Sequence, residues 1–249
     1  MSIEVDFGTS PSSNQLSPLS AETSSYNPFN YLRQRNTTKR APFNLLTIKN
    51  AIITQKFLQK WRQATNGYKT TVIHVTFENC DFSNLEAKDV CNFIFGYIRA
   101  ISVKIEGDVN TFLEEFFEDD RIQKLQNVRI ICDKNINLDD KILLNRIFRP
   151  GNLQVLELRK ILLSELFVNK FIQQFRESSR LTRCINRLFF GGECPWPLHQ
   201  INFQKQLLKS ADREKYRFEN RFGYYSLNIE YSCVKLIYAN YLFKENFNY

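Results

Sequence analysis

Histidine and cysteine are the residue types that most often supply nucleophiles, general bases and zinc ligands. The chain has only two histidines and six cysteines: His74, His199, Cys80, Cys91, Cys132, Cys184, Cys194 and Cys233. A nucleophilic pair of Cys80 with His74 is conceivable, but chance explains their proximity better. A zinc site needs several Cys or His ligands at close spacing, and no C-x-x-C pair occurs. We therefore predict no catalytic residue and no metal site.

Carboxylates are densest between Asp108 and Asp120, where a divalent cation would be the expected ligand. This segment holds Glu114, Glu115, Glu118, Asp119 and Asp120. It lacks the alternating oxygen ligands and the glycine of a calcium loop, so we interpret it as a solvated helix face. Glycine-rich phosphate loops, G-x-S-x-G and H-E-x-x-H are also absent. We expect no cofactor and no enzymatic activity, with an enzyme of unfamiliar type as one alternative.

The basic residues are unevenly distributed along a chain whose net charge is +8. Residues 141–249 carry 18 Lys/Arg against 9 Asp/Glu, whereas residues 1–140 carry 16 against 17. A basic C-terminal half could bind nucleic acid, which is the second alternative function. The basic residues are nevertheless interleaved with acids, and no dense Lys/Arg run with stacking aromatics is present. A solvated surface is the preferred interpretation.

The N-terminal residues and the hydropathy of the chain bear on its compartment. The chain starts with the polar, acidic segment Met1–Asp6 and not with a basic-then-apolar signal sequence. No apolar run approaches the ~20 residues that span a bilayer. We therefore expect a cytoplasmic and/or nuclear protein without membrane association, in which the cysteines stay reduced.

A loose repeat of the form apolar-x-x-apolar-x-apolar runs along most of the chain. Its cleanest copy is Leu153-x-x-Leu156-x-Leu158-x-x-Ile161. The central apolar residues of the seven copies are Leu46, Val75, Ile101, Val128, Leu156, Leu188 and Leu227. Steps of this size, about 26 to about 39 residues, are typical of a stacked repeat array.

Each repeat has two halves with different hydrophobic periodicity. The first half is a short apolar or β-branched run, which predicts a strand. The second half carries apolar residues at helical spacing, such as Phe57, Leu58 and Trp61, which predicts an amphipathic helix of two to three turns. Strands that alternate with helices pair in parallel through right-handed crossovers. The expected fold is an α/β solenoid with a parallel sheet on its concave face and helices on its convex face.

The composition divides the chain into three regions. Residues 1–40 are rich in Ser, Thr, Asn and Pro and lack periodic apolar residues, so they predict a disordered tail. Residues 41–190 form the repeat array. Residues 191–249 are interpreted as the last irregular repeat and a C-terminal cap, in which a mostly polar helix or linker over 199–217 precedes two strands.

The residues between the apolar positions of each strand should face outward from the sheet. They are mixed polar and charged residues, which suit protein recognition on a rigid surface, although they could also pair with one another. The predicted partner-binding residues are Thr47, Lys49, His74, Thr76, Glu78, Ser102, Lys104, Arg129, Ile131, Glu157 and Arg159. In this prediction Lys49, Glu78 and Lys104 share one row, and Arg129, Glu157 and Arg159 form a second mixed patch.

The repeat resembles a degenerate leucine-rich repeat. The segments Leu-Gln-Asn-Val-Arg-Ile-Ile-Cys-Asp from Leu125 and Leu-Gln-Val-Leu-Glu-Leu-Arg-Lys-Ile from Leu153 carry the resemblance. The position where that family places Asn or Cys holds Ala51, Cys80, Glu106, Asp133, Ile161, Glu193 and Ser232. The chain therefore departs from a regular asparagine ladder.

The segment Leu46-Thr-Ile-Lys-Asn-Ala-Ile-Ile-Thr54-x-x-Phe57-Leu58-x-x-Trp61 is similar to the repeated segment of nematode F-box-associated proteins. That family recruits substrates to a ubiquitin ligase. Residues 1–42 do not contain the helical, Leu-Pro-led pattern of an F-box. The resemblance implies an interaction scaffold that recognises a partner or substrate, with the ligase-docking module lost or supplied elsewhere. We expect a monomer that binds a protein partner on the concave face.

Overall fold

The computed structural model describes residues 2–6, 29, 43–164, 166–177, 185–191, 214–220, 223–230 and 233–240. The strands are β1 (Ser2–Asp6), β2 (Phe43–Lys49), β3 (Thr70–Glu78), β4 (Ile98–Arg99), β5 (Ser102–Gly107), β6 (Asn127–Asn137), β7 (Val155–Leu162), β8 (Arg187–Gly191), β9 (Glu214–Asn220), β10 (Gly223–Glu230) and β11 (Cys233–Asn240). The helices are α2 (Gln55–Ala64), α3 (Ala87–Cys91), the π-helix η1 (Asn92–Tyr97), α4 (Leu113–Glu118), the 3-10 helix η2 (Asp120–Lys124), α5 (Asp140–Ile147) and α6 (Phe167–Glu177).

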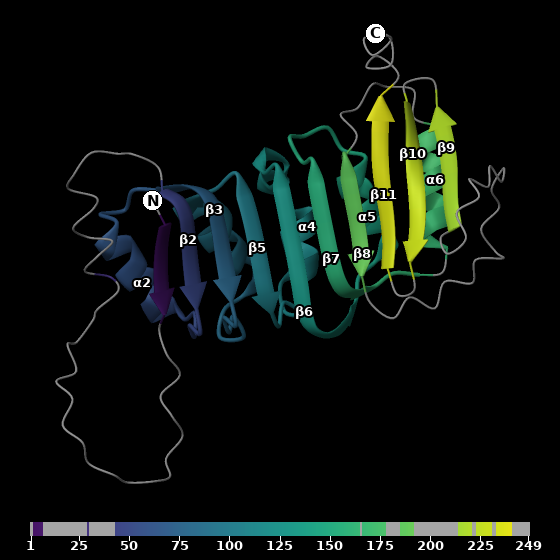
Figure 1. Cartoon of the computed structure of the whole chain (residues 1–249). Helices are drawn as coiled ribbons and strands as arrows, with labels where there is room; N and C mark the ends of the chain where they lie inside the picture. Colours follow the sequence, from purple (N-terminus) through teal and green to yellow (C-terminus); the bar gives the residue numbers. More distant parts are fainter. Residues whose placement is uncertain are drawn as a thin grey trace, which may run out of the picture.

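One mostly parallel sheet organises the chain, so the α/β prediction is confirmed. The strand order is β1-β2-β3-β5-β6-β7-β8-β11-β10-β9, and β4 pairs with β3 off this path. Every pair from β1 to β8 is parallel, whereas β8, β11, β10 and β9 are joined by antiparallel pairs. The described helices lie on one face of the sheet, and no described helix covers the other face (Figure 1).

The first repeat shows how this arrangement follows from the sequence. Thr54 ends the strand-to-helix turn, and its hydroxyl accepts a hydrogen bond from the Phe57 N–H at 3.2 Å, which caps α2. Phe57, Leu58 and Trp61 then fall on one face of the helix and are buried. The strand contributes Leu46 and Ile48, which are fully buried beneath the helix layer.

Aromatic rings connect this repeat to those that follow. Phe93 from η1 contacts the rings of Phe57, Trp61 and Phe77 at centroid distances of 5.8, 5.3 and 5.8 Å. The row continues from Phe77 through Phe82 and Phe112 to Phe116. Edge-to-face pairs of this kind add about 0.5 to about 1.5 kcal/mol each to the burial of the rings. The core is therefore a continuous layer between the sheet and the helices, shared by neighbouring repeats.

Strand ends in the first two repeats share a left-handed corner. Asn50 and Asn79 follow β2 and β3 directly and have φ angles of 51° and 52°. Asparagine tolerates this conformation better than other residues with a side chain. The Asn50 N–H donates to the Glu78 carbonyl, and the Asn79 N–H donates to the Glu106 carbonyl. The corner turns the chain so that Ala51 and Cys80 enter the core.

The register of β5 differs from the sequence prediction by two residues. Val75 pairs with Val103, not with Ile101, and Val103 pairs with Val128. Ile101 is 41% exposed because the chain bends between β4 and β5. Lys104 therefore lies beside Thr76 and Arg129, and the residue beside Glu78 is Glu106. The predicted row of Lys49, Glu78 and Lys104 is wrong at its third position.

Both ends of the chain depart from the predicted organisation. Ser2–Asp6 form β1, which pairs in parallel with β2, so the prediction of a disordered tail is wrong for these five residues. The rest of 1–40, apart from Phe29, lies outside the described residues. At the other end β10 and β11 confirm the two predicted strands, but β9 occupies Glu214–Asn220, where a helix or linker was expected up to residue 217. The Leu227 copy is part of an antiparallel strand and does not continue the parallel array.

Candidate functional site: the open sheet face

Backbone register arranges the outward residues of the parallel strands in three rows, which together define the open face. The first row is Leu45, His74, Ser102, Asn127, Val155 and Arg187. The second row is Glu4, Thr47, Thr76, Lys104, Arg129, Glu157 and Phe189. The third row is Lys49, Glu78, Glu106, Ile131 and Arg159. All eleven predicted partner-binding residues lie in these rows, with Ser102 and Lys104 displaced as described above.

Ion pairs cross the N-terminal half of the open face. Lys49 bridges two strands because its Nζ lies 3.1 Å from a Glu4 carboxylate oxygen and 3.3 Å from one of Glu78. The hydrogen bond with Glu4, followed by that with Glu78, raises the pKa of Lys49 above its usual value. Lys104 pairs with Glu106 on its own strand at 2.5 Å. The cations in this half are thus matched by carboxylates, and little positive charge is left for a ligand.

The C-terminal half of the open face carries an arginine cluster made of Arg129, Glu157, Arg159 and Phe189. Glu157 accepts from Arg159 at 2.7 Å, and Arg129 approaches its other carboxylate oxygen at 3.4 Å. The Arg159 guanidinium also lies over the Phe189 ring, 5.5 Å from its centroid. The structure therefore brings together the predicted patch of Arg129, Glu157 and Arg159.

The two arginines of this cluster are more exposed than Lys49 and Lys104, whose side chains are 26% and 35% exposed. The side chains of Arg129 and Arg159 are 53% and 52% exposed, whereas that of Glu157 is only 15% exposed. One carboxylate is shared by two guanidinium groups, so the cluster has a net charge of +1. Each guanidinium has five N–H donors, and most of them stay available to a ligand.

The remaining predicted residues contribute shape more than charge. Thr47 lies on the open face but is only 7% exposed, whereas His74 is exposed and Thr76, Ser102 and Ile131 are intermediate. The rows also contain residues that were not predicted to bind a partner: Glu4, Leu45, Glu106, Asn127, Val155, Arg187 and Phe189. For Arg187 and Phe189 the sequence signal was the same alternation, in the weak copy around Leu188.

The described cysteine thiols lie in positions that do not favour catalysis. Cys80, Cys91 and Cys132 are buried, and burial is the main cause that raises their pKa values to about 11, about 12 and about 12. Cys80 and Cys132 are thus part of the core, and the Cys80 thiol donates a hydrogen bond to the Ile48 carbonyl of the preceding strand. His74 is exposed on the open face, so the structure does not assemble a Cys80–His74 pair. Cys184, Cys194 and His199 lie outside the described residues.

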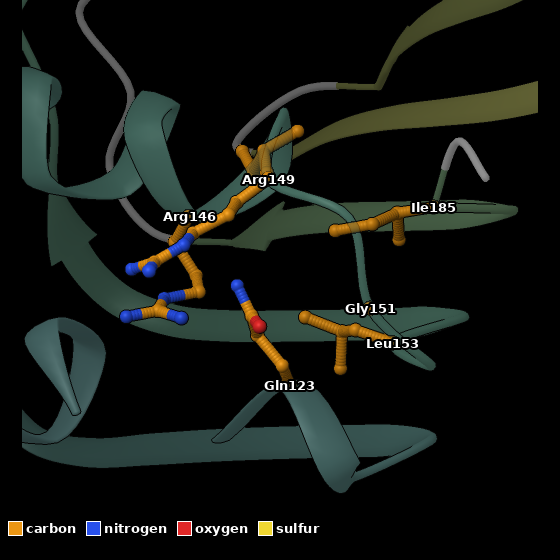
Figure 2. A pocket seen from close by; sticks show the side chains of 7 residues that line it. Gln123, Arg146, Arg149, Gly151, Leu153 and Ile185 are labelled. Carbon is orange, nitrogen blue, oxygen red and sulfur yellow. The ribbon is translucent and has the colours of Figure 1, made fainter. Parts of the chain in front are cut away.

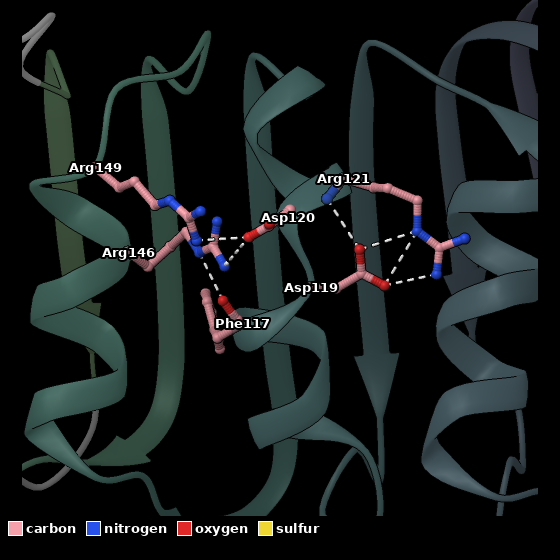
Figure 3. A network of polar contacts seen from close by, with 6 residues as sticks. All are labelled: Phe117, Asp119, Asp120, Arg121, Arg146 and Arg149. Atoms are coloured by element: carbon pink, nitrogen blue, oxygen red, sulfur yellow. Dashed lines mark hydrogen bonds and ion pairs between the residues drawn. The ribbon is translucent and has the colours of Figure 1, made fainter.

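Within the described residues, no three His, Cys, Asp or Glu side chains converge as metal ligands. The acidic segment instead forms local ion pairs on the helix side, where Asp119 binds Arg121 and Asp120 binds Arg149 (Figure 3). Arg121 also lies over the Phe95 ring at 5.6 Å. None of the described helices has the length and apolar character needed to cross a membrane.

Comparisons with protein-family models, with curated proteins and with solved structures give no match to this chain.

Proposed function

We propose that the chain is a non-enzymatic interaction scaffold that binds an acidic segment of a protein partner through the arginine cluster on its open face. The observation that carries this proposal is the pair of half-exposed guanidinium groups on either side of a mostly covered Glu157. Guanidinium groups bind carboxylates with two parallel hydrogen bonds, so acidic side chains are the matching ligand. The Phe189 ring adds an apolar contact beside the charges.

The architecture supports a recognition role. The strands from β1 to β8 pair in parallel, and the described helices lie on one side of the sheet, which leaves a broad surface of backbone for a ligand on the other (Figure 1). We infer a leucine-rich-repeat-like solenoid whose concave face is this open face. The resemblance to F-box-associated proteins further suggests that the partner is a substrate delivered to a ubiquitin ligase, and we place the chain in an intracellular compartment on the same ground.

The proposal is tested by comparing the partners that copurify from native cells with three forms of the protein. The forms are wild type, R129A/R159A, and K56A/K60A, which removes the same charge from exposed positions on α2. We expect R129A/R159A to lose at least one partner that both other forms retain. Identical partners for all three forms would show that the arginine cluster does not recognise them.

A nucleic-acid ligand is the second candidate because Arg187 is also exposed on this half of the open face and Arg159 is stacked on an aromatic ring. Fluorescence anisotropy with a generic single-stranded RNA distinguishes the two ligands. An RNA complex should weaken steeply between about 50 and about 200 mM salt and should lose affinity in R129A/R159A. No binding at the lower salt concentration would exclude this candidate.

A further inference from the structure

Arg187 brings a third arginine beside the arginine cluster, from the next strand of the sheet. It pairs with Val155 in the first row, two positions before Phe189, so it lies diagonally across the β7–β8 pair from Glu157. A strand spacing of about 4.8 Å and a rise of about 3.3 Å per residue put the Cα atoms of Glu157 and Arg187 about 8 Å apart. The Arg187 N–H donates to the Gln154 carbonyl at 3.0 Å, which fixes the start of β8 against β7.

The charges on this part of the open face do not balance. On β6, β7 and β8 the cations of the three rows are Arg129, Arg159 and Arg187, and the only anion is Glu157. Three positive charges and one negative charge give a net charge of +2. Both carboxylate oxygens of Glu157 are engaged, since Arg159 approaches Oε1 and Arg129 approaches Oε2. Arg187 is exposed, and no carboxylate among the described side chains forms an ion pair with it.

The arginines of the cluster keep N–H donors available to a ligand. Arg159 donates from Nε to Glu157 at 2.7 Å, and its flat face lies over the Phe189 ring. A guanidinium that is stacked through its face still carries donors along its edge. The Glu157 side chain is mostly covered, whereas those of Arg129 and Arg159 are half exposed. A ligand that approaches from solvent therefore meets N–H groups before it meets the carboxylate.

A phosphorylated side chain matches this site better than a carboxylate does. At pH 7 a phosphate monoester has a charge of about −1.5 to about −2 and three strong acceptor oxygens. A carboxylate has a single negative charge and two oxygens, so it would leave one of the three arginines without a partner. Guanidinium groups bind phosphate through two parallel hydrogen bonds, as they bind carboxylates. The charge and the number of acceptors both favour phosphate.

The described part of the open face favours one phosphate group over the phosphate chain of a nucleic acid. In its N-terminal half, Lys49 pairs with Glu4 and Glu78, and Lys104 pairs with Glu106. A single-stranded nucleic acid needs a positively charged groove that follows its backbone over several nucleotides. The unmatched charge on the described side chains is instead concentrated on β6, β7 and β8. A protein segment with one phosphorylated residue suits such a local site.

We propose that Arg129, Arg159 and Arg187 together bind a phosphorylated side chain of the protein partner. Arg187 is the residue that makes the site prefer phosphate to carboxylate, because it supplies the positive charge that a carboxylate does not need. This inference rests on the proposed function, which places an acidic segment of the partner on the same cluster. It narrows the partner to proteins that carry this modification.

The test begins with immobilised peptides of degenerate sequence around a central phosphoserine, from which the full chain selects a ligand. The selected peptide is then made with phosphoserine, glutamate or serine at the central position, and its affinity is measured by fluorescence anisotropy. We expect the phosphoserine form to bind at least about tenfold more tightly than the glutamate form. Failure to select any peptide overturns the phosphate assignment. Equal affinity for the two forms also overturns it but leaves recognition of an acidic partner in place.

R187A tests the specificity role, because it removes one exposed guanidinium and leaves the cluster itself intact. It should weaken binding of the phosphoserine form at least about tenfold and that of the glutamate form by less than about threefold. R99A, which removes an exposed arginine from β4, is the matched control and should bind both forms like wild type. If R187A weakened both forms equally, Arg187 would not set the preference for phosphate.

The R129A/R159A variant and an RNA competitor complete the experiment. R129A/R159A should lose both the phosphoserine form and the glutamate form. If it bound both like wild type, the anion would lie elsewhere, and the proposed function would fail together with this inference. Generic single-stranded RNA should not displace the phosphoserine peptide at concentrations where the unlabelled peptide does. Displacement by RNA at lower concentrations would identify the ligand as a nucleic acid and overturn the inference.

Discussion

The carboxylate of Asp140, a residue that is only 4% exposed, joins α5 to α6 and to the loop before α6. It lies at the start of α5 and accepts hydrogen bonds from the Ser164 N–H at 2.9 Å, the Ser164 hydroxyl and the Lys170 ammonium group at 2.9 Å. Burial acts to raise its pKa, but the bonds from Ser164 and Lys170 outweigh it and hold the pKa below the usual value. The charged form is therefore the one that ties the β7–α6 connection to α5.

This pKa shift gives the first prediction, which concerns stability against pH. A carboxylate whose pKa is lower in the folded state stabilises the fold above its unfolded pKa of about 3.9 and loses this effect as pH falls through the folded value. We expect D140N to lower the unfolding free energy by about 2 kcal/mol at neutral pH. The difference from wild type should shrink in acid. Urea denaturation at pH 7 and pH 3 measures it.

The matched control for this prediction is D133N, since Asp133 is an exposed aspartate at a neighbouring position in the array. It should change stability by less than about 0.5 kcal/mol at either pH. If the loss in D140N were the same at both pH values, the charge of Asp140 would not be responsible for it.

At the scale of elements, the left-handed corners after β2 and β3 explain why these strands end where they do. Asn79 has a φ of 52°, and its N–H donates to the Glu106 carbonyl at 3.0 Å. A β-branched residue cannot adopt this conformation without strain, whereas glycine can. We predict that N79V loses about 1 to about 3 kcal/mol of unfolding free energy and that N79G changes it by less than about 1 kcal/mol.

Chemical denaturation of both variants tests the corner. T71V is the control, because Thr71 is an exposed strand residue where a β-branched side chain fits well. It should leave stability within about 0.5 kcal/mol of wild type. A loss in N79G equal to that in N79V would show that the Asn79 side chain matters more than its backbone conformation.

The elements also show what could be predicted from the sequence. Apolar stripes such as Phe57, Leu58 and Trp61 identified α2 because only a helix brings residues at that spacing to one face. The register of β5 could not be predicted, because Ile101 completes the apolar pattern as well as Val103 does. Which of the two pairs with Val75 depends on the bend after β4, which has no local sequence signal.

The candidate site was predictable to a similar extent. Strand alternation placed Arg129, Glu157 and Arg159 on one face, and the parallel register brought them together as expected. The sequence could not show that Glu157 is covered while the two arginines are half exposed, since exposure depends on the packing of neighbouring side chains. A small helix-side cavity lined by Gln123, Arg146 and Ile185 was also missed, because these residues come from three separate segments (Figure 2).

At the scale of the whole molecule, the described core is one continuous layer between the sheet and the helices, built from contacts between neighbouring strand–helix units. Two separate aromatic groups illustrate this. Phe93 contacts Phe57, Trp61 and Phe77 in the first repeats, whereas Phe171 contacts Phe148 and Phe167 near the end of the parallel array. Both Phe93 and Phe171 are fully buried. In a repeat array, damage to one interface should weaken the nearby repeats most.

The last prediction compares F93A with F171A by native-state hydrogen exchange. Each change removes a buried ring and should cost about 3 to about 5 kcal/mol of local stability. F93A should increase exchange mainly in β2, α2 and β3, and F171A mainly in β7, α5 and α6, because stability is transmitted between neighbours and decays with distance along the array. A fully cooperative globular domain would instead lose protection uniformly in both variants. Identical exchange patterns for F93A and F171A would therefore contradict an array of separately stacked repeats, and opposite gradients would support it.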